Sequence, residues 1–102
     1  MPKLIKIAEI SDIPPGSSRF VEADGQLLAL FNIDGTFYAL DDACPHEGAP
    51  LSDGEISGCV VVCPWHGWKF DVTNGKRVSP LGVPNARTYH VVVEGNDVMV
   101  EV

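Results

Sequence analysis

The sequence predicts a small all-β protein, an antiparallel sandwich or barrel of short strands. Three observations lead to this prediction. Turn-forming dipeptides recur at short intervals, the segments between them are rich in β-branched and aromatic residues, and no window shows sustained helical periodicity. The chain has 102 residues, with 10 glycines and 8 prolines, which suits one turn-rich domain with a modest core. We therefore expect a single domain over residues 1–102.

The turn dipeptides place the chain reversals. Asp24-Gly25, Asp34-Gly35 and Asn74-Gly75 suit tight hairpin turns. Gly95-Asn96-Asp97 suits a further reversal near the C-terminus. Between these turns we expect strands, each a run rich in Val, Ile, Leu, Phe or Tyr, at residues 3–10, 19–23, 26–33, 36–40, 59–62, 69–71, 88–93 and 98–102.

The regular spacing of hairpin turns is lost between Asp41 and Pro84. This segment holds five of the eight prolines and every Cys and His residue except His90. Proline stiffens a loop because its ring fixes φ and removes a backbone donor. A stiff, loop-rich insertion in a β scaffold is a suitable place for a functional site. We expect a ligand-binding subdomain over about residues 41–84.

The balance of acidic and basic residues limits the classes of binding partner that we expect. Fourteen acidic residues against seven basic ones give a net charge of −7 and a pI near 4.6. An acidic surface repels phosphate backbones and anionic lipid, so we expect neither nucleic acid nor a membrane as partner. No apolar run approaches the roughly 20 residues of a membrane span. Residues 1–6 lack the features of a secretory signal, so we expect a cytoplasmic protein.

Two short segments carry the chemistry, Cys44-Pro45-His46 and Cys63-Pro64-Trp65-His66. Sixteen residues separate them, and each offers one thiolate and one imidazole. Gly48 and Gly67 beside these ligands allow the backbone to approach closely. Such a set of four can close a tetrahedral zinc site or hold an iron–sulfur cluster. Ordinary zinc fingers pair Cys with Cys and His with His. Two loops that each provide one Cys and one His instead suit a cluster of two bridged irons, with both thiolates on one iron and both imidazoles on the other.

The remaining Cys and His residues have simpler interpretations. Cys59 begins the apolar run of residues 59–62 with no histidine nearby, so we expect a buried structural thiol. His90 lies in a predicted strand, and we expect it on a strand face rather than as a third imidazole ligand. An odd number of cysteines disfavours a disulfide framework.

At these residues the chain resembles the Rieske [2Fe–2S] family. The two Cys/His loops, the following Gly67-Trp68-x-Phe70 and the Asn74-Gly75 turn are similar to that family over essentially the whole chain. The resemblance implies a Rieske-like antiparallel β-sandwich with a two-loop [2Fe–2S] cluster-binding subdomain inserted. It also implies a proline-rich third loop over the cluster, for which residues 79–84 are the equivalent.

The resemblance assigns one cluster per chain to four ligands. It implies that Cys44 and Cys63 bind one iron and that His46 and His66 bind the other. The two tryptophans that flank His66 are expected to shield the site from water.

The departures from the respiratory Rieske proteins predict a low reduction potential. Ala49 and Trp65 stand where those proteins carry an additional disulfide-bonded cysteine in each loop. Trp68 and Phe70 stand where they carry side-chain hydroxyls that donate to sulfur. Hydrogen bonds to the sulfurs stabilise the more negative, reduced cluster, so their loss lowers the potential. A low potential suits an acceptor of electrons from a flavoprotein.

The resemblance implies a soluble, monomeric one-electron carrier rather than an enzyme. It would pass electrons from an NAD(P)H-dependent flavin reductase to a terminal oxygenase of the aromatic-ring-hydroxylating type. Only 36 residues follow His66, too few for an oxygenase's own mononuclear iron domain. Two alternatives stay open: a Rieske-like small subunit of an NADH-dependent nitrite reductase, and a structural zinc-binding module. Transient docking to a basic partner is expected to use scattered acids: Glu22, Asp24, Asp41, Asp42, Glu47, Asp53 and Glu55.

Overall fold

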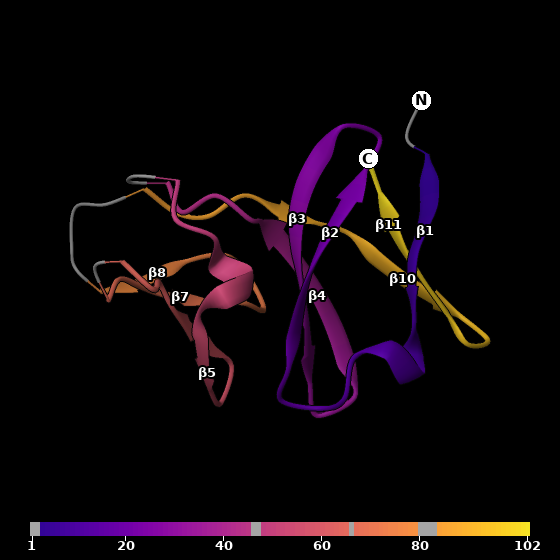
Figure 1. Ribbon diagram of the computed structural model, residues 1–102, viewed down its shortest axis with the longest axis horizontal. Coiled ribbons are helices and arrows are strands. Elements are labelled where there is room, and N and C mark those ends of the chain that lie inside the picture. Colours follow the sequence, from indigo (N-terminus) through magenta and orange to yellow (C-terminus); the bar gives the residue numbers. More distant parts are fainter. Residues whose placement is uncertain (1–2, 46–47, 66, 80–83) are drawn as a thin grey trace.

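The computed structural model describes residues 3–45, 48–65, 67–79 and 84–102. These residues form two parts, a sandwich and a smaller sheet beside it (Figure 1). The sandwich contains β1 (Leu4–Glu9), β2 (Ser18–Ala23), β3 (Gln26–Ile33), β4 (Thr36–Asp41), β9 (Thr88–Tyr89), β10 (Val91–Glu94) and β11 (Asp97–Glu101). The smaller sheet contains β5 (Glu55–Ser57), β6 (Val60–Val62), β7 (Lys69–Asp71) and β8 (Arg77–Ser79).

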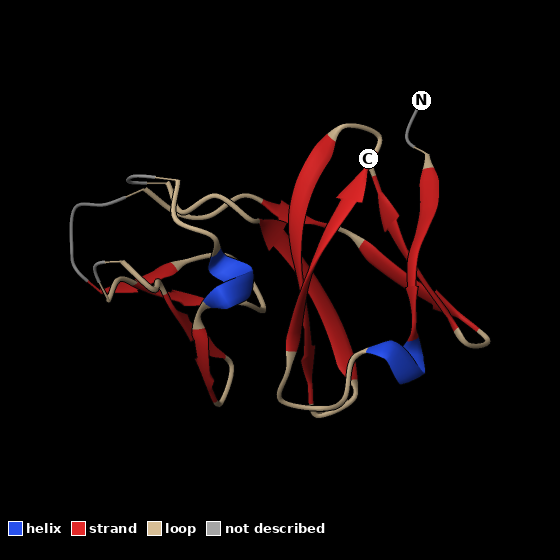
Figure 2. Cartoon of the chain, viewed as in Figure 1, coloured by secondary structure: helices blue, strands red, loops and turns tan. Residues whose placement is uncertain are grey.

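Every strand pairing is antiparallel, which confirms the predicted all-β class. The strand orders are β1-β11-β10, β2-β3-β4-β9 and β5-β6-β7-β8. Because β4 pairs with β9, the chain leaves the sandwich and returns to it at neighbouring strands. The smaller sheet is therefore an insertion between β4 and β9, here called the cluster subdomain. Within the described ranges, two short 3-10 helices accompany the strands, η1 (Ile10–Asp12) in the sandwich and η2 (Leu51–Asp53) in the subdomain (Figure 2).

Two of the predicted hairpin turns are confirmed by their backbone angles, because both central residues have positive φ. Asp24 and Gly25 have φ of 50° and 81°, and Asp34 and Gly35 have 52° and 92°. Two positive φ values in sequence match the twist of antiparallel strands, and Asp and Gly tolerate them best. These turns set the register of β2, β3 and β4.

Strand β3 carries a core on each of its faces. Leu28 and Leu30 pack inside the sandwich, whereas Ala29 and Phe31 belong to a second core cluster under the subdomain. All four are fully buried, which explains why this strand is a continuous apolar run rather than an alternating one. The second cluster also contains Leu40, Cys44, Ala49, Leu51, Val61, Cys63, Phe70, Val72 and Ala86. The subdomain is thus packed directly against the sandwich.

Four local predictions need correction. Strands β5 and β8 were not predicted, because three residues are too few to show a period-two pattern. The single strand predicted at residues 88–93 is two strands, β9 and β10, which lie in different sheets. The predicted strand at 59–62 begins at Val60 instead.

Among the described residues, no helical segment has both the length and the apolar character of a membrane span.

Candidate metal centre

The two predicted thiolate ligands lie in one core cluster. Cys44 follows β4 and is 3% exposed, and Cys63 follows β6 directly and is 2% exposed. All three cysteines lie within the described residues, and none of them forms a disulfide there. The fold therefore brings Cys44 and Cys63 into the same apolar environment from two different strand ends.

The loops that follow these cysteines are closed in the same way. The Cys44 N–H donates to the Ala49 carbonyl at 2.8 Å, and the Gly48 N–H donates to the Cys44 carbonyl at 2.9 Å. In the second loop the Cys63 N–H donates to the Trp68 carbonyl at 2.6 Å, and the Gly67 N–H donates to the Cys63 carbonyl at 3.0 Å. The chain from Cys44 to Ala49 and the chain from Cys63 to Trp68, six residues each, are thus closed by the same hydrogen-bond scheme.

Glycine is required in each loop by its backbone angle. Gly48 has a φ of 77° and Gly67 a φ of 70°, in the left-handed region that disfavours a Cβ. Among the described residues, apart from the chain neighbours, no atom lies within 4 Å of a Cβ added at either position. The positive φ alone therefore favours glycine at these two equivalent positions.

The predicted imidazole ligands fall outside the described residues. His46 and His66 follow their cysteines by two and three positions, between the cysteine and the glycine of each loop in the sequence. Glu47 and residues 80–83 of the predicted third loop also lie outside the described part. The structure thus brings together the two predicted cysteines, and the histidine assignments stay predictions.

Asp42 anchors the first loop to the sandwich. Its buried carboxylate accepts a hydrogen bond from the Ser52 N–H at 2.9 Å. Its backbone joins β3 to η2, since its N–H donates to the Leu27 carbonyl at 3.0 Å and its carbonyl accepts from Leu51 at 2.7 Å. The Ser18 hydroxyl adds a bond to the Ser52 carbonyl at 2.8 Å. The prediction that Asp42 belongs to a docking surface is therefore wrong, because this carboxylate is committed to the fold.

Asp41 lies where the chain leaves the sandwich for the subdomain, and it is hydrogen-bonded to the segment by which the chain returns. Its carboxylate accepts a hydrogen bond from the Tyr89 hydroxyl at 2.5 Å, and its N–H donates to the Arg87 carbonyl at 2.9 Å. Burial, followed by the hydrogen bond to Asp41 and its negative charge, raises the pKa of Tyr89 to about 12. The Arg87 guanidinium lies 5.0 Å from the centre of the Tyr89 ring. Sequence reasoning missed this structural role of Asp41, whose only signal was its place at a strand end.

The environments of four further side chains bear on the predictions. Trp65 is 57% exposed, and its shielding of the neighbouring His66, which lies outside the described residues, stays a prediction, whereas Trp68 is half-buried and packs against the core cluster that holds Cys44 and Cys63. Cys59 lies in a turn and is partly exposed rather than buried. His90 is exposed at the break between β9 and β10, not on a strand face.

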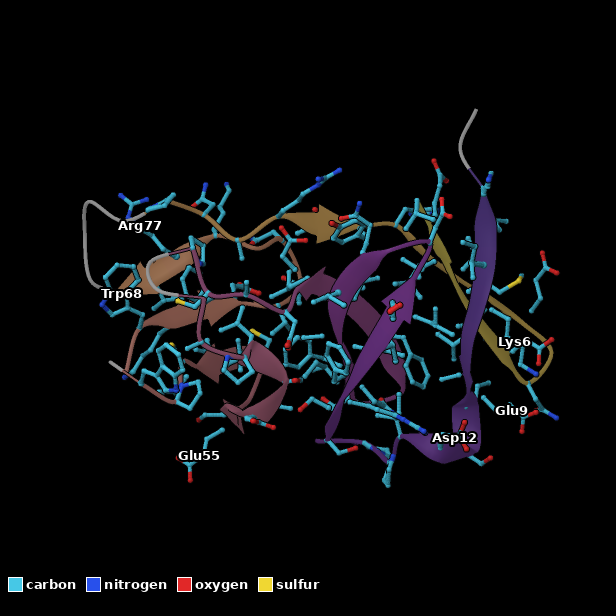
Figure 3. The ribbon with its side chains drawn as sticks, turned by 45° about the horizontal axis from the view of Figure 1, so that its top comes forward. Lys6, Glu9, Asp12, Glu55, Trp68 and Arg77 are labelled. Atoms are coloured by element: carbon cyan, nitrogen blue, oxygen red, sulfur yellow. The ribbon has the colours of Figure 1, made fainter. Side chains whose placement is uncertain are left out.

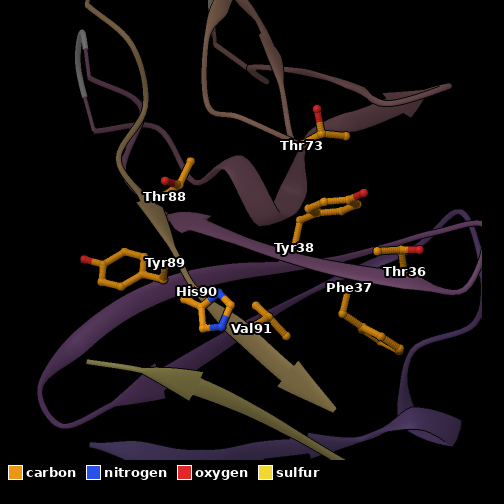
Figure 4. A pocket seen from close by; sticks show the side chains of 8 residues that line it. All are labelled: Thr36, Phe37, Tyr38, Thr73, Thr88, Tyr89, His90 and Val91. Carbon is orange, nitrogen blue, oxygen red and sulfur yellow. The ribbon is translucent and has the colours of Figure 1, made fainter. Parts of the chain in front are cut away.

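Two hollows open on the described surface. The larger, of about 440 Å³, lies where β10 diverges from β4 and is lined by Thr36, Phe37, Tyr38, Thr73, Thr88, Tyr89, His90 and Val91 (Figure 4). The smaller, of about 320 Å³, lies beside the second loop and is lined by Asp53, Glu55, Val62, Cys63, Pro64 and Gly67. Only the smaller hollow borders a predicted ligand among the described residues, and it carries exposed acids.

The donor set fits a Rieske [2Fe–2S] cluster. Two buried thiols sit at equivalent positions in matched loops, and each loop also carries one histidine in its sequence. A cluster with two thiolates on one iron and two imidazoles on the other can be bound by two loops that each provide one Cys and one His. The apolar residues around the thiols provide the water-poor surroundings in which such a cluster is stable.

Comparison with known proteins decides the family. A model of the Rieske [2Fe–2S] domain matches residues 3–94. The chain belongs to the Rieske [2Fe–2S] family. It is 36% identical to the ferredoxin component of a naphthalene 1,2-dioxygenase system from Pseudomonas aeruginosa, over 97% of this chain and 95% of that one.

Solved structures extend the comparison. The ferredoxin in a complex of reduced oxygenase and oxidised ferredoxin of carbazole 1,9a-dioxygenase is 35% identical, with a TM-score of 0.89 over 95% of this chain and 91% of that one. A nitrite reductase small subunit is 26% identical, with a TM-score of 0.83 over 96% of this chain and 97% of that one.

These comparisons confirm the resemblance to Rieske-type ferredoxins. The relatives from the naphthalene and carbazole dioxygenase systems are ferredoxin components, which carry electrons, rather than catalytic enzymes. The implied cofactor is a Rieske [2Fe–2S] cluster, and family membership favours it over a zinc site built from the same four residues.

Proposed function

We propose that this Rieske ferredoxin carries single electrons from an NAD(P)H-dependent flavin reductase to a terminal, aromatic-ring-hydroxylating oxygenase. The observation that supports this most strongly is similarity to a dioxygenase ferredoxin component over nearly the full length of both chains. The related carbazole dioxygenase ferredoxin has been solved in complex with its oxygenase, which supports the acceptor half of the proposal. The reductase half rests on the low potential that Trp68 and Phe70 predict.

We assign the cluster to Cys44 and Cys63 on one iron and to His46 and His66 on the other. When bound, the cluster supplies a one-electron couple whose potential lies above that of all-cysteine clusters because the imidazoles are neutral. The chain supplies the two thiolates from equivalent loops and excludes water around them with fully buried Leu51, Val61 and Phe70.

We further propose that the chain is a single domain over residues 1–102 and works as a cytoplasmic monomer. Around the second loop, the exposed Trp65 and the exposed acids Asp53 and Glu55 suit brief docking of a redox partner. Electron-transfer encounters of this kind bury less than about 1,200 Å².

Reconstitution tests the electron route. The holoprotein is combined with NADH, a flavoprotein ferredoxin reductase and the oxygenase of a naphthalene dioxygenase system, and hydroxylated product is measured. Product should form only when the holoprotein is present, and Cys63→Ser should abolish it. Reduction of the holoprotein by the reductase without any oxidation by the oxygenase would reject the acceptor half of the proposal.

The likeness to a nitrite reductase small subunit supports a second candidate function. A small subunit belongs to a stable complex, whereas a carrier dissociates between its partners. Isolation of the protein from its native host under mild conditions separates these functions. A stoichiometric large subunit on size exclusion would favour the nitrite reductase, and a chain of 11.0 kDa eluting alone would favour the carrier.

A further inference from the structure

The positive charges of this acidic chain are concentrated in one segment. Residues 69–87 contain four basic residues and one acid, a net charge of +3, whereas the rest of the chain has three basic residues against thirteen acids, a net charge of −10. Such a sign asymmetry within one small domain indicates two surfaces with different partners. The four basic residues are Lys69, Lys76, Arg77 and Arg87.

These four side chains are not used in ion pairs within the described structure. On the sandwich, by contrast, Lys6 contacts Glu9 and Asp97 at 3.3 and 3.1 Å, and Arg19 contacts Asp12 at 3.7 Å. No salt bridge joins any of the four to another described residue. Lys69, Lys76 and Arg87 are exposed.

The one acid of the segment is hydrogen-bonded locally and forms no ion pair with these basic side chains among the described residues. This acid, Asp71, turns its carboxylate to the N–H and hydroxyl of Thr73, at 2.9 and 2.6 Å. The Arg77 Nε is buried and has no hydrogen-bond partner among the described residues. The exposed Lys69, Lys76 and Arg87 therefore carry their positive charge toward solvent, whereas Arg77 is half-buried.

The fold places three of these charges along the β8 edge of the cluster subdomain and the fourth, Lys69, on the neighbouring strand β7, where it pairs with Ser79 of β8. Its sheet has the order β5-β6-β7-β8, so β8 with Arg77 forms the edge opposite to β5 with Glu55 (Figure 3). The Ala86 N–H donates to the Gly75 carbonyl at 2.8 Å, and the Arg77 N–H donates to the Asn85 side chain at 3.1 Å. These bonds hold the segment with Arg87 alongside β8. We call Lys69, Lys76, Arg77 and Arg87 the basic edge.

Distance separates the basic edge from the acids across the sheet. Neighbouring strands lie about 4.8 Å apart, so three spacings from β5 to β8 span about 14 Å. Charges are screened over about 8 Å at physiological ionic strength. A partner that approaches one edge therefore experiences mainly the charges of that edge and not the net charge of the whole chain.

We propose that the basic edge is a docking surface for an acidic face of a protein redox partner. This inference rests on the proposed carrier function, because a carrier must bind an electron donor and an electron acceptor in turn. Opposite charges on the two edges allow it to distinguish these partners, since like charges brought together disfavour the wrong complex. The acidic residues Asp53 and Glu55 across the sheet then face the partner of opposite charge. A polyanion as extended as nucleic acid would also meet the acidic remainder of the chain.

Binding of fluorescently labelled poly-L-glutamate to the holoprotein tests the basic edge. Measured by anisotropy at low ionic strength, the unmodified holoprotein should bind this acidic polypeptide despite its own negative net charge, and added salt should release it. Lys76→Glu combined with Arg77→Glu should weaken binding about tenfold or more. The matched control is Lys3→Glu with Arg19→Glu on the sandwich, which lowers the net charge equally and should change binding less than twofold.

Each outcome bears on the proposal. Equal weakening by both pairs, or no binding by the unmodified holoprotein, would overturn it. If the Arg77 variant fails to fold, Lys69→Glu with Lys76→Glu replaces it, because both side chains are exposed. The visible spectrum of every sample reports the cluster, so a folded protein that lacks a cluster counts against the proposed function and not against the basic edge.

Discussion

Cys44 and Cys63 occupy equivalent positions in two loops that are closed by the same pair of backbone hydrogen bonds. Each cysteine accepts a bond from a glycine four residues later and donates one to the residue after that glycine. Both thiols are almost fully buried in one core cluster. This equivalence gives the chain two matched thiols, and the sequence adds one histidine to each loop, the supply that a Rieske cluster requires.

Replacement of single cysteines should separate ligands from the bystander. Cys44→Ser and Cys63→Ser should each lose the cluster, because serine is a poor substitute for a soft thiolate ligand. Cys59→Ser should keep it, since Cys59 lies in a partly exposed turn outside both loops. Iron content and visible absorbance of the purified variants measure this. Retention of a full cluster in Cys63→Ser would show that the ligand assignment is wrong.

Replacement of the loop glycines should disturb the site more than the fold. Gly48→Ala and Gly67→Ala each force a Cβ into the left-handed region, at a cost of about 1 kcal/mol or more in the free energy of unfolding. Gly35→Ala in a hairpin turn carries the same kind of strain and serves as the control. Iron occupancy should fall in the two loop variants and stay full in the control. An equal loss of iron in all three would mean that general destabilisation is the cause.

The two tryptophans should differ in their effect on stability. Trp68→Ala should lower the free energy of unfolding by about 2 kcal/mol, because a half-buried indole that packs on the core is lost. Trp65→Ala should change it by less than about 0.5 kcal/mol, since that side chain is 57% exposed. Denaturant unfolding of the holoprotein measures both values. A large loss of stability in Trp65→Ala would reveal contacts that its exposure does not suggest.

Tyr89 should make stability decrease in strongly alkaline solution. Its pKa is raised in the folded protein from 10.0 to about 12, so above pH 10 the unfolded chain releases the phenolic proton first. The stabilisation is therefore complete below pH 10 and is lost as the pH rises from 10 toward 12. Tyr89→Phe should remove this part of the pH dependence, and Tyr38→Phe is the control. Ultraviolet titration of the phenols checks the same value, and a Tyr89 that ionises near pH 10 would contradict it.

Much of the fold could be predicted from local patterns. The turns at Asp24-Gly25 and Asp34-Gly35 have a backbone geometry that few residue pairs tolerate, and they bound β3 correctly. The apolar run of β3 indicated burial but not that its two faces serve different cores, which depends on where the subdomain packs. The three-residue strands β5 and β8 left no periodic signal.

The candidate site was partly predictable for a similar reason. The spacing of cysteines, histidines and glycines is a local property, and it identified both loops. The carboxylates of Asp41 and Asp42 could not be told from surface acids, because their partners Tyr89 and Ser52 lie far along the chain or in an unpredicted helix. Exposure of Trp65 and Cys59 likewise depends on the packing of the whole subdomain.

The central claim is that four residues of this chain, Cys44, His46, Cys63 and His66, hold a two-iron cluster that accepts one electron. An anaerobic reductive titration of the purified protein, followed by visible absorbance and electron paramagnetic resonance, tests it most directly. A red-brown protein with two irons per chain should take up one electron and develop the paramagnetic signal of a reduced [2Fe–2S] cluster. A folded, colourless protein with stoichiometric zinc and no iron would contradict the claim.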